Sequence, residues 1–277
     1  MRSLARRMSE FHGEARVRSA AAWRRALVCG AAACALAAAV AVPAARAEDA
    51  AKLDRPAIEA IVKDYLLQHP EVIEDAINVL QERRATAEAE KQRQAVSANS
   101  DAILSAPQNA VLGNPKGDVT LVEFFDYNCG YCKRALPDML GLINDDKKLK
   151  VVLKDYPILS PGSIEAASVA IAVKKQIQGD KFLEFHKELL ASRGQVGKDR
   201  ALEVAKDVGI DMKKLQADMA EQGVRTAIGE NLRLGDTLGV SGTPSYILAG
   251  EVVSGAIGYD ALKAKIDAVR QCGKTLC

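Results

Sequence analysis

The spacing of hydrophobic residues changes part-way along the chain, and this change separates two regions. From residue 54 to about 104, apolar residues recur every three to four positions, which predicts helices. Pro70 interrupts the pattern and predicts a break between two helices. Residues 81–94 are dense in charged residues, glutamine and alanine, so this part of the helical region has no broad apolar face to bury.

The apolar stripe between Ile58 and Leu80 has no obvious partner in its own region. It is expected to pack either on the rest of the chain or on copies of itself. The pattern favours neither outcome, because three full heptads with apolar a and d positions are absent. Residues 55–95 are therefore a candidate segment for homo-oligomerisation.

After about residue 105, short β-rich apolar runs alternate with helical patterns. The expected strands are 111–112, 119–125, 150–156, 245–249 and 252–254. The expected helices are 129–142, 162–178, 180–192, 198–208, 211–221, 224–238 and 259–270. Pro137 is expected to kink the first of them, because proline has no backbone N–H. A β-α-β unit implies parallel strands, and the last two strands, joined at Gly250-Glu251, predict a hairpin. The expected fold class is α/β, with a mixed sheet covered by helices on both faces.

The first 47 residues have the three-part pattern of a secretory signal. An arginine-rich stretch precedes an alanine-rich apolar segment from Ala26 to Val42, and Ala45-Arg46-Ala47 has the form of a cleavage site. The segment is short for a membrane-spanning helix, so cleavage after Ala47 and export are expected.

Removal of this segment would change the sign of the net charge. The whole chain has 38 Lys+Arg and 36 Asp+Glu, and residues 1–47 hold 8 Arg and 2 Glu. The remaining chain has 38 − 8 = 30 basic and 36 − 2 = 34 acidic residues, a net charge of −4. The excess of basic residues belongs to the signal, so nothing in the charge favours nucleic acid as a partner.

The motif Cys129-Gly130-Tyr131-Cys132 directly follows the predicted strand 119–125. A thiol at the start of a helix is stabilised as a thiolate by free backbone N–H groups and the helix dipole. The second thiol lies one turn further on, where it can attack a mixed disulfide. A structural disulfide or half of a zinc site are the alternatives, but zinc needs a second pair with similar spacing, which Cys272 and Cys277 do not provide. We therefore expect redox catalysis by cysteines, with no metal and no cofactor.

Cys272 and Cys277 are expected to form a local structural disulfide that pins the C-terminus in an oxidising compartment. A second redox pair and a metal clip are the alternatives. The structural interpretation is preferred because no strand-to-helix junction surrounds these two cysteines.

The stretch from Phe124 to Lys133 (FFDYNCGYCK) resembles the DsbA-type thioredoxin-like proteins of bacterial periplasms, and so does Gly242-Thr243-Pro244 before a predicted strand. The helical insert at about 160–240 is similar to that family's pattern. The N-terminal helices resemble those of ScsC-like and Com1-like members, which are often linked to copper tolerance. The resemblance covers roughly residues 55–270. It implies a thioredoxin-like domain at 105–277, preceded by a helical region at 48–104.

The resemblance also implies roles for the matched residues. Cys129 would be an exposed nucleophile and Cys132 the buried resolving thiol. Thr243-Pro244 would form a cis-proline loop, leaving the Thr243 backbone free to pair with a substrate peptide. Gly130-Tyr131 contains no histidine, so we expect a lowered pKa for Cys129 but a less extreme redox poise than in the most oxidising members.

Two charged residues in the predicted strands are further candidates for tuning the site. By resemblance, Glu123 would lie beneath the active site and assist proton transfer from Cys132. Lys154, in the otherwise apolar run at 150–156, is a candidate charge partner of Glu123. The alternative for both is a strand-end position with the head group in water.

The sequence therefore predicts a periplasmic thiol-disulfide oxidoreductase that acts on cysteines of exported proteins and exchanges electrons with a membrane redox partner. Isomerase or reductase action is favoured over a monomeric dithiol oxidase for two reasons. A monomeric oxidase would leave the N-terminal helical region without a function, and the Gly-Tyr dipeptide is not strongly oxidising. A copper-tolerance protein that binds Cu(I) through two thiolates is an alternative from another class. A pure interaction module assembled by its N-terminal helices is a third.

Overall fold

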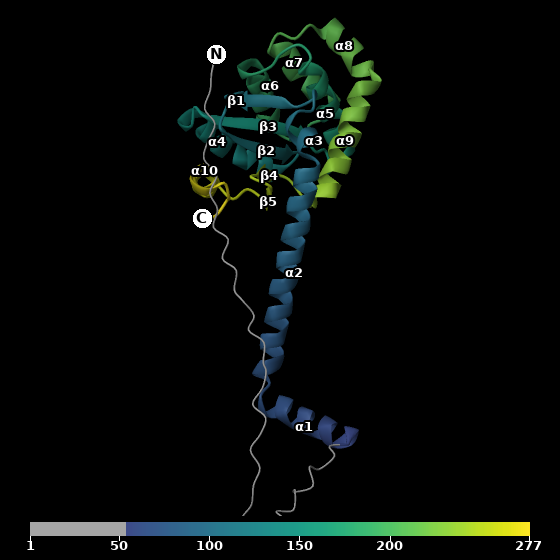
Figure 1. Ribbon diagram of the computed structural model, residues 1–277. Coiled ribbons are helices and arrows are strands. Elements are labelled where there is room, and N and C mark those ends of the chain that lie inside the picture. Colours follow the sequence, from purple (N-terminus) through teal and green to yellow (C-terminus); the bar gives the residue numbers. More distant parts are fainter. Residues whose placement is uncertain (1–53) are drawn as a thin grey trace, which may run out of the picture. The chain divides into compact units, whose positions relative to one another are not determined.

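The computed structural model describes residues 54–277 (Figure 1). The predicted signal segment, 1–47, lies outside the described residues. The chain divides into two units between Val62 and Lys63. Within residues 54–277, no helix combines the length and the apolar character needed to cross a membrane.

The N-terminal region is helical, as its apolar spacing predicts. Its helices are α1 (Arg55–Gln68), α2 (Glu71–Ala98) and α3 (Ser100–Leu104). The break falls at Pro70, which is the N-cap of α2. Only the C-terminal end of α2 is anchored on the sheet domain, where Val96 is buried and the Gln92 side chain donates a hydrogen bond to the Leu238 carbonyl (3.0 Å).

Ten large apolar side chains of α1 and of the first half of α2 are between 36% and 72% exposed. They are Ile58, Ile61, Val62, Tyr65, Leu67, Val72, Ile73, Ile77, Val79 and Leu80. Helix α1 contains no buried residue. A run of exposed apolar side chains of this extent is typical of a surface that binds another molecule.

The sheet has five strands in the order β1-β3-β2-β4-β5. They are β1 (Ala110–Gly113), β2 (Val119–Phe125), β3 (Leu149–Asp155), β4 (Ser245–Leu248) and β5 (Glu251–Ser254). Strands β2 and β3 are parallel and are connected by helix α4 (Gly130–Asp145), whereas the other neighbouring strands are antiparallel. This mixed α/β architecture confirms the predicted fold class.

The remaining helices are α5 (Pro161–Val173), α6 (Asp180–Ala191), α7 (Lys198–Asp207), α8 (Met212–Ala220), α9 (Gln222–Leu238) and α10 (Tyr259–Cys272). Helices α5 to α9 form the insert between β3 and β4. Helix α5 is the most buried of them because its sequence, PGSIEAASVAIAV, is small and apolar on nearly every face.

Two features differ from the predicted elements. The hairpin turn lies at Ala249-Gly250 instead of Gly250-Glu251, and both turn residues have positive φ angles (47° and 84°). Two-residue hairpins use such turns because their twist matches that of the strands. Pro137 lies inside α4, and the helix continues past it to Asp145, beyond the expected end at residue 142.

Candidate active site

Cys129 lies at the junction of strand β2 and helix α4, where it is the N-cap of the helix. Its Sγ accepts a hydrogen bond from the Cys132 backbone N–H (3.4 Å), and its thiol donates one to the Thr243 carbonyl oxygen (3.0 Å). The Cys132 thiol, as a hydrogen-bond partner, lowers the pKa of Cys129 to about 5. Smaller contributions to this lowering of the pKa come from Thr243 and from the backbone N–H groups of Cys132 and Tyr131, and burial opposes them.

Cys132 has the opposite character. Its thiol is buried one turn into α4, and both cysteines are in the free thiol form. Hydrogen bonding to Cys129, burial and the nearby charge of Glu123 all raise the pKa of Cys132 far above its usual range. At neutral pH the motif therefore holds one thiolate and one thiol.

The expectation of an exposed Cys129 is wrong, because only 5% of this residue is exposed. The sulfur lies against the Thr243 carbonyl and belongs to the same core cluster as Cys132. The exposed residues of the motif are Tyr131, at 61%, and Gly130. The Arg134 guanidinium lies 4.2 Å from the centroid of the Tyr131 ring.

The Thr243-Pro244 segment faces Cys129 from the loop before β4. Its peptide bond is cis, and this geometry presents the Thr243 carbonyl to the Cys129 thiol. The Ser245 hydroxyl donates to the Gly242 carbonyl (2.7 Å), which holds the loop from its other side. The loop and the motif thus meet although 114 residues separate Cys129 from Thr243.

Glu123 lies on β2 and is buried, 4% exposed, on the face of the sheet that carries the two cysteines. Burial, and then the negative charge of Cys129, raise the pKa of Glu123 to about 8. The charge of Glu123 in turn raises the pKa of Cys132, so this carboxyl acts on the resolving thiol.

Lys154 is not the charge partner of Glu123, and this prediction is wrong. The parallel register of β2 and β3 places Glu123 beside Leu153, and Lys154 beside Phe124. Successive side chains of a strand point to opposite faces, so Lys154 and Glu123 lie on opposite faces of the sheet. The Lys154 ammonium donates to the Ala102 carbonyl, and burial followed by the charge of Lys174 lowers its pKa to about 8.

Several residues that hold the active-site loop were not predicted. Asp126 accepts hydrogen bonds from the backbone N–H groups of Asn128 (2.8 Å) and Leu159 (3.0 Å). The Tyr127 hydroxyl lies 3.2 Å from Nδ1 of His186, which comes from helix α6 of the insert. Burial, and then the charge of Lys174, lower the pKa of His186 to about 3, so this imidazole is neutral. The signal in the sequence was the polar pair Asp126 and Asn128 between an apolar strand and the motif.

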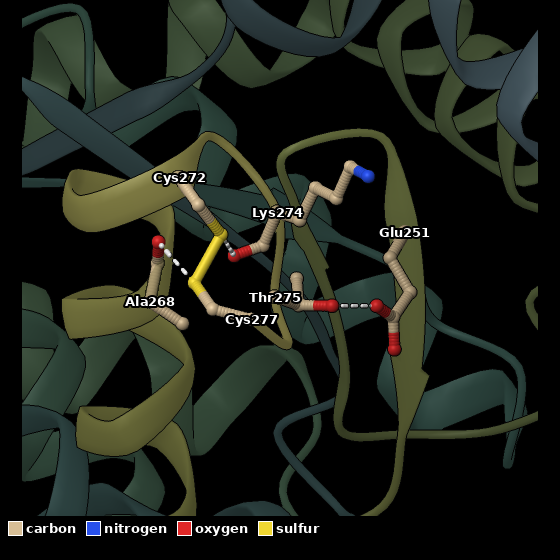
Figure 2. The surroundings of a disulfide bond; sticks show 6 residues. All are labelled: Glu251, Ala268, Cys272, Lys274, Thr275 and Cys277. Atoms are coloured by element: carbon tan, nitrogen blue, oxygen red, sulfur yellow. Dashed lines mark hydrogen bonds between the residues drawn. A yellow bond between two sulfur atoms is a disulfide. The ribbon is translucent and has the colours of Figure 1, made fainter.

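Cys272 and Cys277 are joined by a disulfide at the end of α10, with their Cα atoms 6.2 Å apart (Figure 2). Thr275, inside this loop, is hydrogen-bonded to Glu251 of the edge strand β5. Arg270 of the same helix binds Asp118, immediately before β2, whereas Cys129 follows the other end of that strand. The two cysteine pairs therefore lie at opposite ends of β2. No group of three or more potential metal ligands was found among residues 54–277.

Comparison with known proteins identifies the family. The thioredoxin family model matches residues 105–268, more than half of the chain. This chain belongs to the thioredoxin family. The N-terminal domain of the copper resistance protein ScsC matches residues 54–87, so the chain is an ScsC-like member of the DsbA type. This result confirms the resemblance seen in the sequence.

Three solved structures support the same assignment. A thioredoxin-like oxidoreductase from Silicibacter pomeroyi DSS-3 is 38% identical, with 62% of this chain and 98% of that one covered and a TM-score of 0.58. The thiol-disulfide exchange protein alpha-DsbA2 from Wolbachia pipientis is 30% identical (66% and 98% covered, TM-score 0.61). The catalytic domain of Proteus mirabilis ScsC is 26% identical (64% and 97% covered, TM-score 0.59). The chain thus has the fold of a thiol-disulfide oxidoreductase.

The chain spans about a quarter of the length of the first curated relatives that it matches. The Na(+)/H(+) antiporter NhaA 1 from Salinispora arenicola is 29% identical over 158 residues, which are 56% of this chain and 24% of the antiporter. Disulfide bond formation protein D from Bacillus subtilis is 24% identical over 181 residues, with 61% of this chain and 81% of that protein covered.

Proposed function

We propose that this chain is a thiol-disulfide oxidoreductase that acts through Cys129 and Cys132 on cysteines of exported proteins, with isomerase or reductase action favoured. One observation carries the proposal: the two thiols of one motif have opposite proton affinities. The pKa of Cys129 is lowered to about 5, whereas that of Cys132 is raised. A thiolate that is stable at neutral pH and sits beside a protonated thiol can attack a disulfide and be resolved afterwards.

In the reductase direction, the Cys129 thiolate attacks one sulfur of a substrate disulfide. A bond forms between Cys129 and that sulfur, and the other substrate sulfur leaves as a thiolate. Cys132 then loses its proton and attacks Cys129 Sγ, which releases the second substrate thiolate and leaves Cys129–Cys132 oxidised. In the isomerase direction, the first thiolate released attacks another disulfide of the substrate and displaces a second substrate thiolate. That thiolate attacks the substrate sulfur bonded to Cys129, so a new substrate disulfide forms, the Cys129 thiolate leaves, and there is no net oxidation.

Five further residues take part in this scheme. Glu123 accepts the proton of Cys132 at the resolving step, which its burial on the same face and its raised pKa of about 8 support. Thr243 and Pro244 bind the substrate peptide next to the reacting sulfur, which the contact between the Thr243 carbonyl and the Cys129 thiol supports. Gly130 and Tyr131 form the exposed rim and set the redox poise.

Two assays test the proposal and its direction. The reduced protein is mixed with ribonuclease carrying scrambled disulfides, and recovery of ribonuclease activity reports isomerisation. In parallel, the oxidised protein is mixed with reduced ribonuclease, and the same readout reports oxidation. Faster recovery in the first assay supports an isomerase, and faster recovery in the second supports a dithiol oxidase. Failure of both assays, with wild-type protein that is folded and that also does not reduce insulin disulfides, overturns the proposed function.

The exposed apolar side chains of α1 and α2 support assembly of several copies through residues 55–95. Ile73 and Ile77 lie one turn apart on the same face of α2, so I73E with I77E would place charges in the proposed contact. We expect the mass measured by light scattering to fall to that of one chain. The matched control, N78E with A85E, adds the same charge on the opposite side of the helix, in line with Glu71, and should leave the mass unchanged.

Isomerase action also needs a supply of electrons that keeps Cys129 reduced. We propose that the protein acts in the periplasm, as the signal pattern of residues 1–47 indicates, and that a membrane thiol-disulfide protein reduces it.

Copper binding is a second candidate, supported by the match of residues 54–87 to the N-terminal domain of a copper resistance protein. Two thiolates are soft ligands that suit Cu(I). This candidate predicts one Cu(I) per reduced CxxC pair and no recovery of scrambled ribonuclease. The oxidoreductase predicts recovery in the absence of copper.

A further inference from the structure

The active-site loop is tied to the helical insert by the side chain of Asn128, the residue before Cys129. Its Oδ1 accepts a hydrogen bond from the Val196 N–H (2.7 Å). Its Nδ2 donates to the Val196 carbonyl (2.8 Å) and to the Ser163 hydroxyl (3.1 Å). Asn128 thus pairs with the Val196 backbone as a neighbouring strand would. Val196 and Ser163 are fully buried, and Asn128 itself is half-buried.

The backbone around Asn128 is held from the other side by Asp126. The Asn128 N–H donates to Asp126 Oδ1 (2.8 Å), and the Cys129 N–H donates to the Asp126 carbonyl (3.0 Å). A second tie to the insert follows one turn later, where the Lys133 ammonium donates to the Ser192 carbonyl (2.6 Å). The segment that carries Cys129 is therefore fixed to a part of the chain about 65 residues away in sequence.

We infer that Asn128 is a positioning residue, which holds Cys129 so that its sulfur points at both the Cys132 N–H and the Thr243 carbonyl. The contact with the Cys132 N–H stabilises the thiolate, and it is sensitive to the direction in which the chain enters α4, because hydrogen bonds weaken steeply when they lengthen or bend. The insert thereby acts on the reactivity of Cys129 through Val196 and Ser163. This inference rests on the proposed function of Cys129 as the nucleophile.

The alternative is that Asn128 only fastens the insert to the sheet domain and affects stability alone. The two roles differ in what they do to the thiol. A fastening role changes the free energy of unfolding and leaves the ionisation of Cys129 as it is. A positioning role changes the ionisation and the redox equilibrium of Cys129 in the folded protein.

The experiment compares N128A and S163A with the wild-type full chain. The pKa of Cys129 is measured from thiolate absorbance against pH, and the equilibrium with glutathione is measured in the same samples. We expect the acid dissociation constant of Cys129 to fall about tenfold in N128A, one pKa unit, and about threefold in S163A. The glutathione equilibrium should shift toward the oxidised protein in both variants, because the thiolate of the reduced form has lost stabilisation.

Asn114 provides a matched control. Its side chain also pairs with the backbone, accepting from the Lys116 N–H (2.9 Å) and donating to the Lys147 carbonyl (2.9 Å), but it lies before β2, at the far end from Cys129. N114A should lower the melting temperature without changing the thiol.

Two results would overturn the inference while leaving the proposed function in place. The first is a wild-type pKa and glutathione equilibrium in N128A. The second applies if N128A does not fold: an unchanged thiol in folded S163A then has the same meaning. If the wild-type protein itself does not exchange with glutathione, the proposed function fails instead.

Discussion

The two cysteine pairs of residues 54–277 sit at opposite ends of helices, and their chemistry differs accordingly. Cys129 caps the N-terminus of α4, where its sulfur receives a backbone N–H. Cys272 is the last residue of α10, and in its disulfide the Cys277 sulfur lies 3.3 Å from the Ala268 carbonyl oxygen (Figure 2). A thiolate is stabilised by N–H groups at a helix N-terminus and destabilised by carbonyls at a C-terminus.

This difference explains why one pair suits exchange and the other suits a permanent bond. A cysteine with a low pKa is a good leaving group, so a disulfide that contains Cys129 is easily reduced. Reduction of Cys272–Cys277 would create thiolates beside carbonyl oxygens, so that disulfide is favoured in an oxidising compartment. The position of a cysteine on a helix is therefore as informative as the spacing between cysteines.

Removal of the Cys129 sulfur should have the largest effect. We expect C129S to reduce insulin more slowly by about a thousandfold or more, with glutathione as the reductant, because the attacking thiolate is gone. The double variant C272S and C277S serves as the control and should stay within about twofold of wild type, since the pair lies far from the site. A comparable loss in the control would show that the second pair takes part in exchange.

Much of this comparison could be predicted from the sequence, because the signals are local. The apolar run of β2 and the CxxC motif directly after it fall within a few residues of each other. The same holds for the disulfide, whose cysteines are five positions apart. Local signals also placed Pro70 between two helices.

The errors concern features that only tertiary pairing decides. A strand with both faces buried is a continuous apolar run, so its sequence does not tell which side chains share a face. Lys154 was assigned to the wrong face for this reason, and only the register of β2 with β3 corrects it. The ties of Asn128 to Val196 span 68 positions, and no periodicity encodes them. The burial of Cys129 also depends on a distant segment, the loop at Thr243.

The second-largest difference is expected in how the alkylation rates of the two cysteine pairs depend on pH. Alkylation requires the thiolate, so in reduced protein the rate at Cys129 should be half-maximal near its pKa of about 5 and constant above about pH 6. The rates at Cys272 and Cys277 should keep rising through neutral pH, because carbonyl oxygens at a helix C-terminus disfavour a thiolate. Peptide mass spectrometry after timed alkylation measures each site separately. Coincident profiles would contradict the role assigned to the helix termini.

Glu123 acts on only one of the two pairs, and E123Q tests this. We expect E123Q to slow the attack of Cys132 on a preformed mixed disulfide by about a hundredfold, because glutamine cannot accept the proton. Formation of the mixed disulfide by Cys129 should change by less than about threefold. Rapid-quench trapping of the mixed disulfide separates the two steps, and equal slowing of both would exclude a specific role in resolution.

Glu123 should also make stability depend on pH. Its pKa in the folded protein is raised to about 8 from an ordinary value of 4.5, so the unfolded chain ionises first. The folded state therefore loses stability as the pH rises from 4.5 through about 8, and E123Q lacks this loss. In urea unfolding, E123Q should gain stability relative to wild type between pH 5 and pH 8, and a constant difference would contradict a buried carboxyl.

The smallest expected effect is that of the C-terminal disulfide on stability. The bond closes a loop of only six residues, so the chain-entropy relation gives a loss of about 2 kcal/mol in the free energy of unfolding for C272S with C277S. The hydrogen bond between Thr275 and Glu251 loses its support, and the edge strand β5 should show faster amide exchange. Urea unfolding followed by circular dichroism measures the loss. If stability is unchanged while thiol exchange falls, the pair is a second redox centre, and the contrast between the two helix ends does not hold.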